Sequence, residues 1–252
     1  MKKVKIGFLD SGIGGVTVLK ECIKTEPNFE YLYYSDSLNN PYGDKDKEEV
    51  LKIVSNIVDF LIFNDCSIIV IACNTASCIC VNYLRDKYKN VKFIAIEPAI
   101  KLAYDKNKDD NTLIMATKGT MDSEKFHILY HKYNNNNCYL LSCVGLANLI
   151  EEGNDKLLKE YLIDNLGKYK GIVSSVVLGC THYPLIKDEI KEILGDVLFY
   201  DGSIGVARQL VRVILDNYYV SDGEFDITFI DSSNDLGKKV RFFEILESDN
   251  YE

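Results

Sequence analysis

Short apolar runs alternate with longer segments of helical periodicity along this chain of 252 residues. The runs are rich in Val, Ile and Leu, and most are too uniformly apolar for a strand with one face in water. They therefore predict strands that are covered on both sides. The predicted strands are Val4–Leu9, Tyr31–Tyr34, Ser67–Ala72, Val91–Ile96, Thr112–Ala116, Cys138–Ser142, Ile172–Leu178, Val197–Tyr200 and Asp226–Ile230.

The segments between these runs place apolar residues three and four positions apart, which is the period of an amphipathic helix. One such helix passes through Val50 and Leu61, with Asp46 and Glu49 as its expected N-cap and capping partner. The same period predicts helices over Leu157–Leu166, Pro184–Leu194, Val206–Tyr219 and Leu236–Leu246. Alternating strands and helices indicate an α/β fold with mostly parallel sheets.

The order of elements also repeats. Asp10 and Thr117 each end a predicted strand and lie 107 residues apart, and Cys73 and Cys180 end two others at the same spacing. This repeat predicts two pseudo-symmetric lobes, each a mostly parallel sheet flanked by helices. Because ligands of open parallel sheets bind beyond the carboxyl ends of the strands, these four residues should surround one active-site cleft between the lobes.

The last strand and helix are expected to return to the first lobe and make it discontinuous. We therefore assign residues 1–97 and 206–252 to the first lobe and residues 98–205 to the second.

The composition limits which binding partners and which cellular compartment we expect for this chain. The chain has 38 acidic and 29 basic residues and a net charge of −9, with no basic stripe, so nucleic acid is not an expected partner. No stretch approaches the roughly 18 apolar residues of a membrane helix, and the N-terminus does not resemble a secretory signal. Eight cysteines dispersed through apolar segments indicate reduced thiols in a cytoplasmic protein.

A cysteine at a strand end, directly before a helix, is in a place that favours the thiolate. Lowering a thiol pKa from about 8.5 to about 7 requires roughly 2 kcal/mol, which a helix terminus and hydrogen-bond donors could supply. Two facing thiols could then remove a proton from a carbon on one side and return one on the other, which inverts a stereocentre. The expected donors around the substrate are Ser11, Asn74, Thr75, Thr117, Thr120 and Thr181.

The other cysteines have a simpler interpretation. Cys78 and Cys80 lie inside the helix that follows Cys73, and the rest are expected to be small buried apolar side chains. That second set comprises Cys22, Cys66, Cys138 and Cys143.

The glycines of the first loop permit an alternative. Gly12, Gly14 and Gly15 follow a strand as in a phosphate-binding loop, but Thr17 occupies the position of the last glycine in a dinucleotide motif. A nucleotide site is therefore the weaker hypothesis.

A metal site is a second alternative. Cys73, Cys180 and His182 could ligate zinc in a redox or metal sensor, although no Cys-x-x-Cys pair supports this. His127 and His131 are four residues apart on a predicted helix without a zincin glutamate, which is typical of a solvated face. We expect no metal.

Four separated segments resemble the signature segments of the glutamate racemases, within the cofactor-independent aspartate/glutamate racemase family. They are Leu9–Gly15 (LDSGIGG), Pro41–Gly43 (PYG), Ala72–Ser77 (ACNTAS) and Gly179–Leu185 (GCTHYPL). The resemblance implies two α/β lobes that enclose glutamate and interconvert its L and D forms without pyridoxal phosphate or another cofactor. It also implies supply of D-glutamate for peptidoglycan synthesis, and homodimers are common among such proteins.

The resemblance assigns roles to matching residues. Cys73 would remove the α-proton from D-glutamate, assisted by Asp10, and Cys180 would act on L-glutamate, assisted by His182. The family also has a glutamate near the second cysteine, which corresponds here to Glu151 in preference to its neighbour.

The remaining matching positions would hold the substrate's amino and carboxylate groups. They are Asp10, Ser11, Pro41, Tyr42, Gly43, Asn74, Thr75, Thr117, Thr120 and Thr181. An aspartate racemase, or a racemase of another carboxylate, is the nearest rival within the family.

Overall fold

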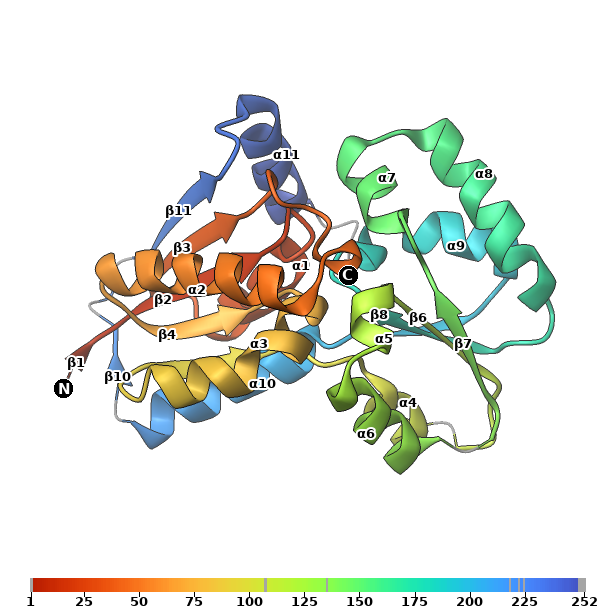
Figure 1. The fold of residues 1–252 in the computed structure, drawn as a ribbon, viewed down its shortest axis with the longest axis horizontal. Coiled ribbons are helices and arrows are strands. Elements are labelled where there is room, and N and C mark those ends of the chain that lie inside the picture. The colour runs from red at the N-terminus through yellow and green to blue at the C-terminus, as the bar shows by residue number, and fades with distance from the viewer. Residues whose placement is uncertain are drawn as a thin grey trace.

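The computed structural model describes residues 2–106, 108–134, 136–217, 219–221, 223 and 225–248. Two lobes lie side by side, each built around its own sheet (Figure 1). Within the predicted helix Val206–Tyr219, residue 218 lies outside the described residues.

The first sheet has five parallel strands in the order β11-β3-β2-β4-β5. Their bounds are β2 (Lys5–Asp10), β3 (Glu30–Ser35), β4 (Cys66–Ile71), β5 (Lys92–Ala95) and β11 (Asp226–Asp231). The helices of this lobe are α1 (Val16–Thr25), the 3-10 turn η1 (Tyr42–Asp44), α2 (Lys47–Phe63), α3 (Asn74–Lys87), α10 (Ser203–Asp216) and α11 (Leu236–Glu247). One apolar core joins the sheet to α1, α10 and α11, and a second joins it to α2 and α3.

The second sheet has four parallel strands in the order β7-β6-β8-β9. Their bounds are β6 (Thr112–Ala116), β7 (Cys138–Ser142), β8 (Ser175–Gly179) and β9 (Leu198–Tyr200). The accompanying helices are α4 (Ile100–Lys106), α5 (Lys118–Met121), α6 (Glu124–Tyr133), α7 (Leu146–Glu152), α8 (Asp155–Leu166), η2 (Gly167–Tyr169), η3 (Tyr183–Ile186) and α9 (Lys187–Leu194). One core includes side chains of α7, α8 and α9, and the other includes those of α4 and α6.

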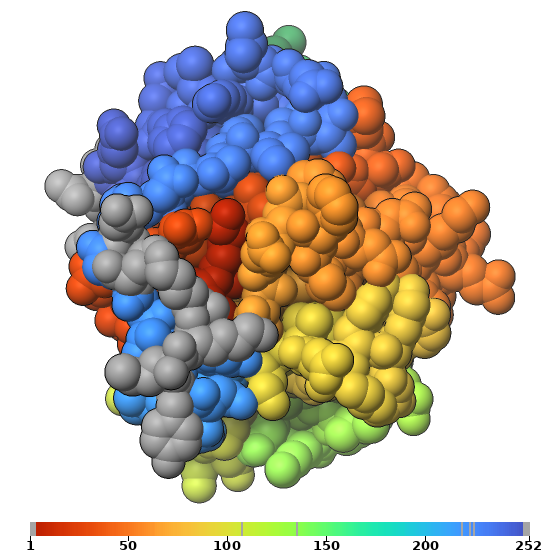
Figure 2. Space-filling view, turned by 90° about the vertical axis from the view of Figure 1, so that its left-hand side faces the viewer, coloured from red at the N-terminus to blue at the C-terminus, as the bar shows by residue number. Residues whose placement is uncertain are grey.

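The two sheets share one topology, which confirms the predicted pair of similar α/β lobes. In each, the first strand along the chain lies between the second and the third, and the fourth lies beyond the third. The strand β11 then pairs with β3 in parallel and extends the first sheet. In Figure 2, the red N-terminal segment is visible between orange and blue segments, so both ends of the chain build this lobe.

All nine predicted strands are present, with bounds shifted by up to three residues. The two-residue strands β1 (Lys2–Lys3) and β10 (Tyr219–Val220), which pair in parallel, are too short to leave a pattern in the sequence. The central strands β6 and β8 are buried throughout, as expected. The prediction that the strand is covered on both faces is wrong for β7, where Tyr139 and Leu140 are 38% and 42% exposed. The reason is that β7 is an edge strand of its sheet.

The predicted helices are also present, although the one expected to reach Tyr219 ends at Asp216, and Tyr219 belongs to β10. Asp46 caps α2 by accepting a hydrogen bond from the Glu49 backbone N–H at 2.7 Å, as expected, whereas the Glu49 carboxylate pairs with Lys45. The helix expected to begin at Pro184 starts as η3 and continues as α9 up to Gly195, whose φ is +92°. Within the described residues, no helix has the length and apolar character needed to cross a membrane.

Candidate active site

Cys73 and Cys180 occupy equivalent places in the two lobes. Cys73 directly follows β4 and is the N-cap of α3, and Cys180 directly follows β8. Both are buried, with 5% and 7% of their surface exposed. The two strand ends are joined across the lobes because the Thr181 hydroxyl donates to both carboxylate oxygens of Asp10 at 3.3 Å.

On the first side, the Cys73 thiol donates to the hydroxyl oxygen of Ser11, with 3.8 Å between the two atoms. Asp10 ends β2 and is completely buried. Its Oδ2 accepts a 2.8 Å hydrogen bond from the Gly15 backbone N–H, so the carboxylate closes the glycine loop and also faces Thr181. The start of α1 and the second lobe together hold Asp10 in place.

Burial has the largest effect on ionisation here. It raises the pKa of Cys73 well above its usual 9.0; the negative charges of Asp10 and, less strongly, Cys180 add to this, and the N–H of Ala76 only partly opposes it. The expected thiol pKa near 7 is therefore wrong for Cys73, because desolvation outweighs the helix terminus. Burial likewise raises the pKa of Asp10 above 3.8. The charge of Cys180 is among the causes that raise the pKa of Cys73, so the two sulfurs lie close enough to interact.

On the second side, three side chains form a chain of contacts. The Cys180 Sγ lies 3.8 Å from Nδ1 of His182, and the His182 Nε2 lies 2.6 Å from Oε2 of Glu151. Burial lowers the pKa of His182, but its contacts with Cys180 and Glu151 outweigh this effect, and the pKa lies well above 6.5. Burial also opposes ionisation of Glu151, yet the imidazole holds its pKa below 4.5. The arrangement favours a charged imidazolium–carboxylate pair.

The glycine loop is shaped around this pair. The Ile13 N–H donates to Glu151 Oε2 at 3.2 Å. A Cβ at Gly12 would lie 2.5 Å from that same oxygen, and one at Gly14 would lie 2.7 Å from the backbone nitrogen of His182. A side chain at Gly14 would meet backbone, and one at Gly12 would displace the Glu151 carboxylate. In this structure the loop that resembles a phosphate-binding loop holds a carboxylate of the second lobe.

The two candidate glutamates at the end of α7 differ in environment. Glu151 is buried, whereas Glu152 is exposed and accepts a 3.2 Å hydrogen bond from Asn148 on its own helix. The geometry thus places Glu151, and not its neighbour, against the imidazole of His182.

Three hydroxyls meet where the lobes adjoin. The Oγ1 of Thr75 lies 2.9 Å from that of Thr117 and 3.3 Å from that of Thr120, and the last two are 2.9 Å apart. Beside them, the buried Oδ1 of Asn74 has no hydrogen-bond partner among the described residues. The structure therefore gathers four of the predicted substrate-binding side chains from α3 and from α5 with its N-cap Thr117.

The predicted turn of Pro41, Tyr42 and Gly43 lies against the same region. A Cβ at Gly43 would be 2.8 Å from Cβ of Thr117, so the turn packs closely on the second lobe. The bond from residue 40 to Pro41 is cis, and the Tyr42 hydroxyl donates to Asp36 at 2.6 Å. Tyr42 is thus engaged within its own lobe.

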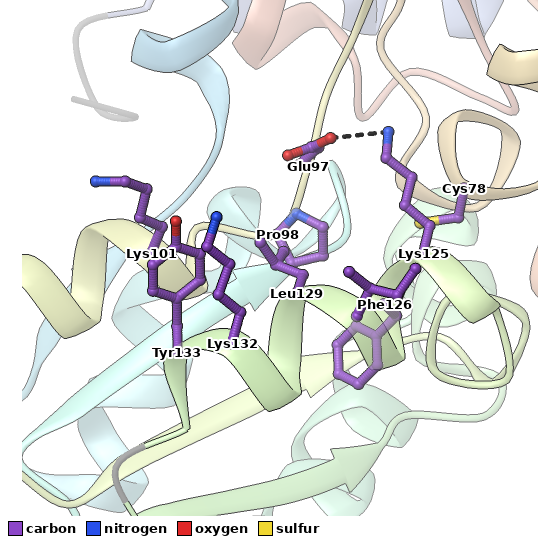
Figure 3. Close-up of a pocket in the computed structure, with 10 residues that line it drawn as sticks. Cys78, Glu97, Pro98, Lys101, Lys125, Phe126, Leu129, Lys132 and Tyr133 are labelled. Atoms are coloured by element: carbon purple, nitrogen blue, oxygen red, sulfur yellow. Dashed lines mark ion pairs between the residues drawn. The ribbon is translucent and has the colours of Figure 1, made fainter.

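The remaining cysteines and histidines lie elsewhere. Among the described residues, none of the eight cysteines forms a disulfide bond. Cys22, Cys66 and Cys143 are buried, as expected, while Cys138 at the start of edge strand β7 is only half-buried. Cys78 lines a separate cavity of about 340 Å³, together with side chains of α4 and α6 (Figure 3).

Among residues whose positions the structure describes, no group of three or more His, Cys, Asp or Glu side chains is arranged to hold a metal ion. His127 and His131 stack on α6, with ring centroids 6.3 Å apart, and both are exposed. Their place on a solvated helix face agrees with the sequence interpretation.

Comparison with known proteins identifies the family. The model of the Asp/Glu/Hydantoin racemase family matches residues 18–209, well over half of the chain. The chain belongs to the Asp/Glu/Hydantoin racemase family. Two similar family members are named glutamate racemase. The one from Clostridium novyi is 44% identical over 220 residues, covering 85% of each chain, and the one from Clostridium botulinum is 40% identical over 251 residues, covering 95% of this chain and 97% of its own.

Solved structures of other racemases have the same fold. The glutamate racemase of Francisella tularensis, solved in complex with D-glutamate, is 27% identical with a TM-score of 0.82; the match covers 98% of this chain and 95% of that one. The glutamate racemase of Thermus thermophilus, in complex with beta-chloro-D-alanine, is 27% identical with a TM-score of 0.79 and coverages of 98% and 94%. These likenesses confirm the predicted racemase resemblance and the two-lobed α/β fold.

Sequence reasoning missed two cations beside the site. Lys238 lies 3.6 Å from Glu151 Oε1, and Arg241 donates to backbone carbonyls at the end of α7. Both are on α11, about 90 positions after Glu151, and no motif marks them. Only their spacing, three residues apart on one helix face, could have suggested a shared contact.

Proposed function

We propose that the chain is a glutamate racemase, which interconverts L- and D-glutamate by a two-base mechanism at the α-carbon and needs no cofactor. The observation that carries this proposal is the placement of two buried thiols at equivalent strand ends of two related lobes, with different assisting groups. Relatives named glutamate racemase at 40–44% identity support glutamate as the substrate.

In the proposed reaction, one cysteine is a thiolate and the other a thiol. Starting from D-glutamate, the Cys73 thiolate takes the α-proton, and Cys180 delivers its own proton to the opposite face of the carbanion. The reaction from L-glutamate reverses these roles. A raised thiol pKa suits this chemistry, because a thiolate that is costly to form is a stronger base towards a weakly acidic C–H.

The assisting residues are expected to act through the two thiols. Asp10 is the charged neighbour of Cys73, and the imidazolium of His182, held by Glu151, faces Cys180. A positive imidazolium next to Cys180 stabilises its thiolate, both before that thiolate takes the proton from L-glutamate and after Cys180 has given its proton to the carbanion formed from D-glutamate.

Hydroxyl and amide groups would bind the amino and carboxylate groups of the substrate. The proposed set is Asp10, Ser11, Pro41, Tyr42, Gly43, Asn74, Thr75, Thr117, Thr120 and Thr181. The Oδ1 of Asn74, which has no hydrogen-bond partner among the described residues, supports this assignment, because a buried acceptor without a partner is costly unless a donor such as an ammonium group reaches it. The threonine hydroxyls would exchange their mutual hydrogen bonds for bonds to carboxylate oxygens.

We also propose lobe boundaries at residues 1–97 with 206–252, and 98–205. The apolar cores support this division, since the clusters around the first sheet contain only buried residues of the first set and those around the second sheet only residues of the second. Cysteines that form no disulfide bond among the described residues agree with a cytoplasmic enzyme that supplies D-glutamate for peptidoglycan synthesis. A homodimer is the expected assembly.

The decisive experiment is a comparison of L-glutamate with L-aspartate, using purified protein stripped of pyridoxal phosphate and metal ions. Optical rotation should decay to zero with glutamate and persist with aspartate. In deuterated water, the product should carry deuterium at the α-carbon. Turnover of aspartate alone would identify another carboxylate racemase, and activity that is lost with EDTA and restored by zinc would support the metal hypothesis.

A further inference from the structure

The end of α7 is held by an arginine from the other lobe. The Nη1 of Arg241 donates to the carbonyl oxygen of Glu151 at 2.7 Å, and its Nη2 donates to that of Ile150 at 2.8 Å. These carbonyls lie in the last turn of α7, where the regular helical hydrogen bonds run out. A guanidinium can engage two acceptors at once with a fixed geometry, and its charge favours a helix C-terminus.

Lys238 lies on the same face of α11 as Arg241 and contacts the side chain of Glu151. Its Nζ is 3.6 Å from Glu151 Oε1, a buried oxygen with no hydrogen-bond partner among the described residues. The other carboxylate oxygen, Oε2, already accepts from Ile13 and contacts His182. Lys238 therefore attracts Oε1 of Glu151, while Oε2 stays in contact with the His182 imidazole.

These contacts cross from one lobe to the other. The helix α11 follows β11, which belongs to the first sheet, whereas α7 packs on the second. On the Cys73 side, Asp10 is held differently, by Gly15 of its own lobe and by Thr181. The contacts of Lys238 and Arg241 with the site thus lie on its Cys180 half, at Glu151 and the end of α7.

We propose that Arg241 and Lys238 are positioning residues for the Cys180 half of the reaction, an inference that rests on the proposed function. Arg241 fixes the end of α7, and Lys238 fixes the rotation of the Glu151 carboxylate. Together they aim His182 at the Cys180 sulfur. Loss of either cation raises the barrier for proton transfer between Cys180 and the α-carbon and leaves the Cys73 step unchanged.

Primary deuterium isotope effects on kcat/KM, measured separately with α-deuterated L- and D-glutamate, test this asymmetry. In Arg241→Ala and Lys238→Met we expect turnover to fall about tenfold or more, as for a misplaced catalytic group. The isotope effect should rise for the L substrate, because its step now limits the rate, and should fall towards one for the D substrate. Lys238→Arg, which retains the charge, should restore most of the turnover.

Lys239→Met is the matched control, since Lys239 is the exposed neighbour on α11 and should keep wild-type rates and isotope effects. Thermal unfolding of each variant identifies any that fail to fold, and Lys238→Met, altered at a partly exposed side chain, then supplies the test. Wild-type turnover in both variants, or slower turnover with unchanged isotope effects, would overturn the positioning role. Inactivity of the wild-type chain towards glutamate would instead refute the proposed function.

Discussion

The Nε2 of His182 and the Oε2 of Glu151 lie 2.6 Å apart, and their side chains are only 1% and 5% exposed. Such a pair is costly to bury and still more costly to break, because removal of one partner leaves an uncompensated charge away from water. We therefore expect the His182–Glu151 pair to serve the chemistry of Cys180, whose sulfur contacts Nδ1 of the same imidazole.

Replacing Glu151 with Gln should lower the pKa of His182, because the contact with Cys180 alone must then oppose burial. NMR titration of the His182 imidazole nitrogens measures this change. Racemisation should fall in parallel. An unchanged His182 titration would show that Glu151 does not hold the proton on the ring.

The same variant should be less stable than the wild type by about 3 kcal/mol, the order found when one partner of a buried pair is removed. Because the pKa of His182 is raised in the folded state, the contribution of His182 to folding stability is complete below pH 6.5. It is lost as the pH rises through the pKa of the folded state. Because the pKa of Glu151 is lowered in the folded state, the contribution of Glu151 to folding stability is complete above pH 4.5. It is lost as the pH falls through the pKa of the folded state. Urea unfolding should therefore show the largest difference between these two pH values.

Replacing Cys73 or Cys180 with Ala should lower racemisation in both directions by about 10³-fold, the scale of acid–base catalysis. Each thiol serves as the acid in one direction and the base in the other, so neither direction can survive alone. Cys78→Ala is the matched control, because Cys78 lines the separate cavity beside α6 (Figure 3) and should leave turnover largely intact. The opposite pattern would overturn the assignment of the thiols.

Asp10→Asn should lower the pKa of Cys73, because the negative charge of Asp10 is the second cause of its elevation after burial. The thiolate absorbance near 240 nm, recorded against Cys73→Ala as a blank, measures this change. Racemisation should nevertheless fall, since a neutral amide can no longer act as the charged neighbour of the thiol. A Cys73 titration equal to that of the wild type would contradict the proposed coupling.

Gly14→Ala should destabilise the fold by about 1–3 kcal/mol, the usual cost of overpacking, and slow racemisation. Its Cβ would meet the backbone nitrogen of His182 at 2.7 Å, and backbone cannot move aside cheaply. Gly167→Ala is the control, because its Cβ meets nothing within 4 Å and its φ of −52° is helical. Urea unfolding should show loss of stability only in the first variant.

Much of the fold could be predicted because its signals are local. Apolar runs mark the strands, and the period of α2 and the Asp46 cap mark a helix and its beginning. The shared spacing of Asp10 with Thr117 and of Cys73 with Cys180 marked the repeat. Edge exposure in β7 and the short pairing of β1 with β10 could not be predicted, because both depend on which segments become neighbours.

The sequence by itself determined the two lobes, the positions of both thiols at strand ends, and the set of polar side chains beside them. Only the tertiary structure decided the ionisation of Cys73, the choice of Glu151 over Glu152, and the contacts of Lys238 and Arg241 with α7. The physical reason is the distance along the chain over which each kind of interaction acts. Periodicity and capping act over a few residues of one segment, whereas burial and charge pairing depend on groups that are distant along the chain and meet only when the lobes come together.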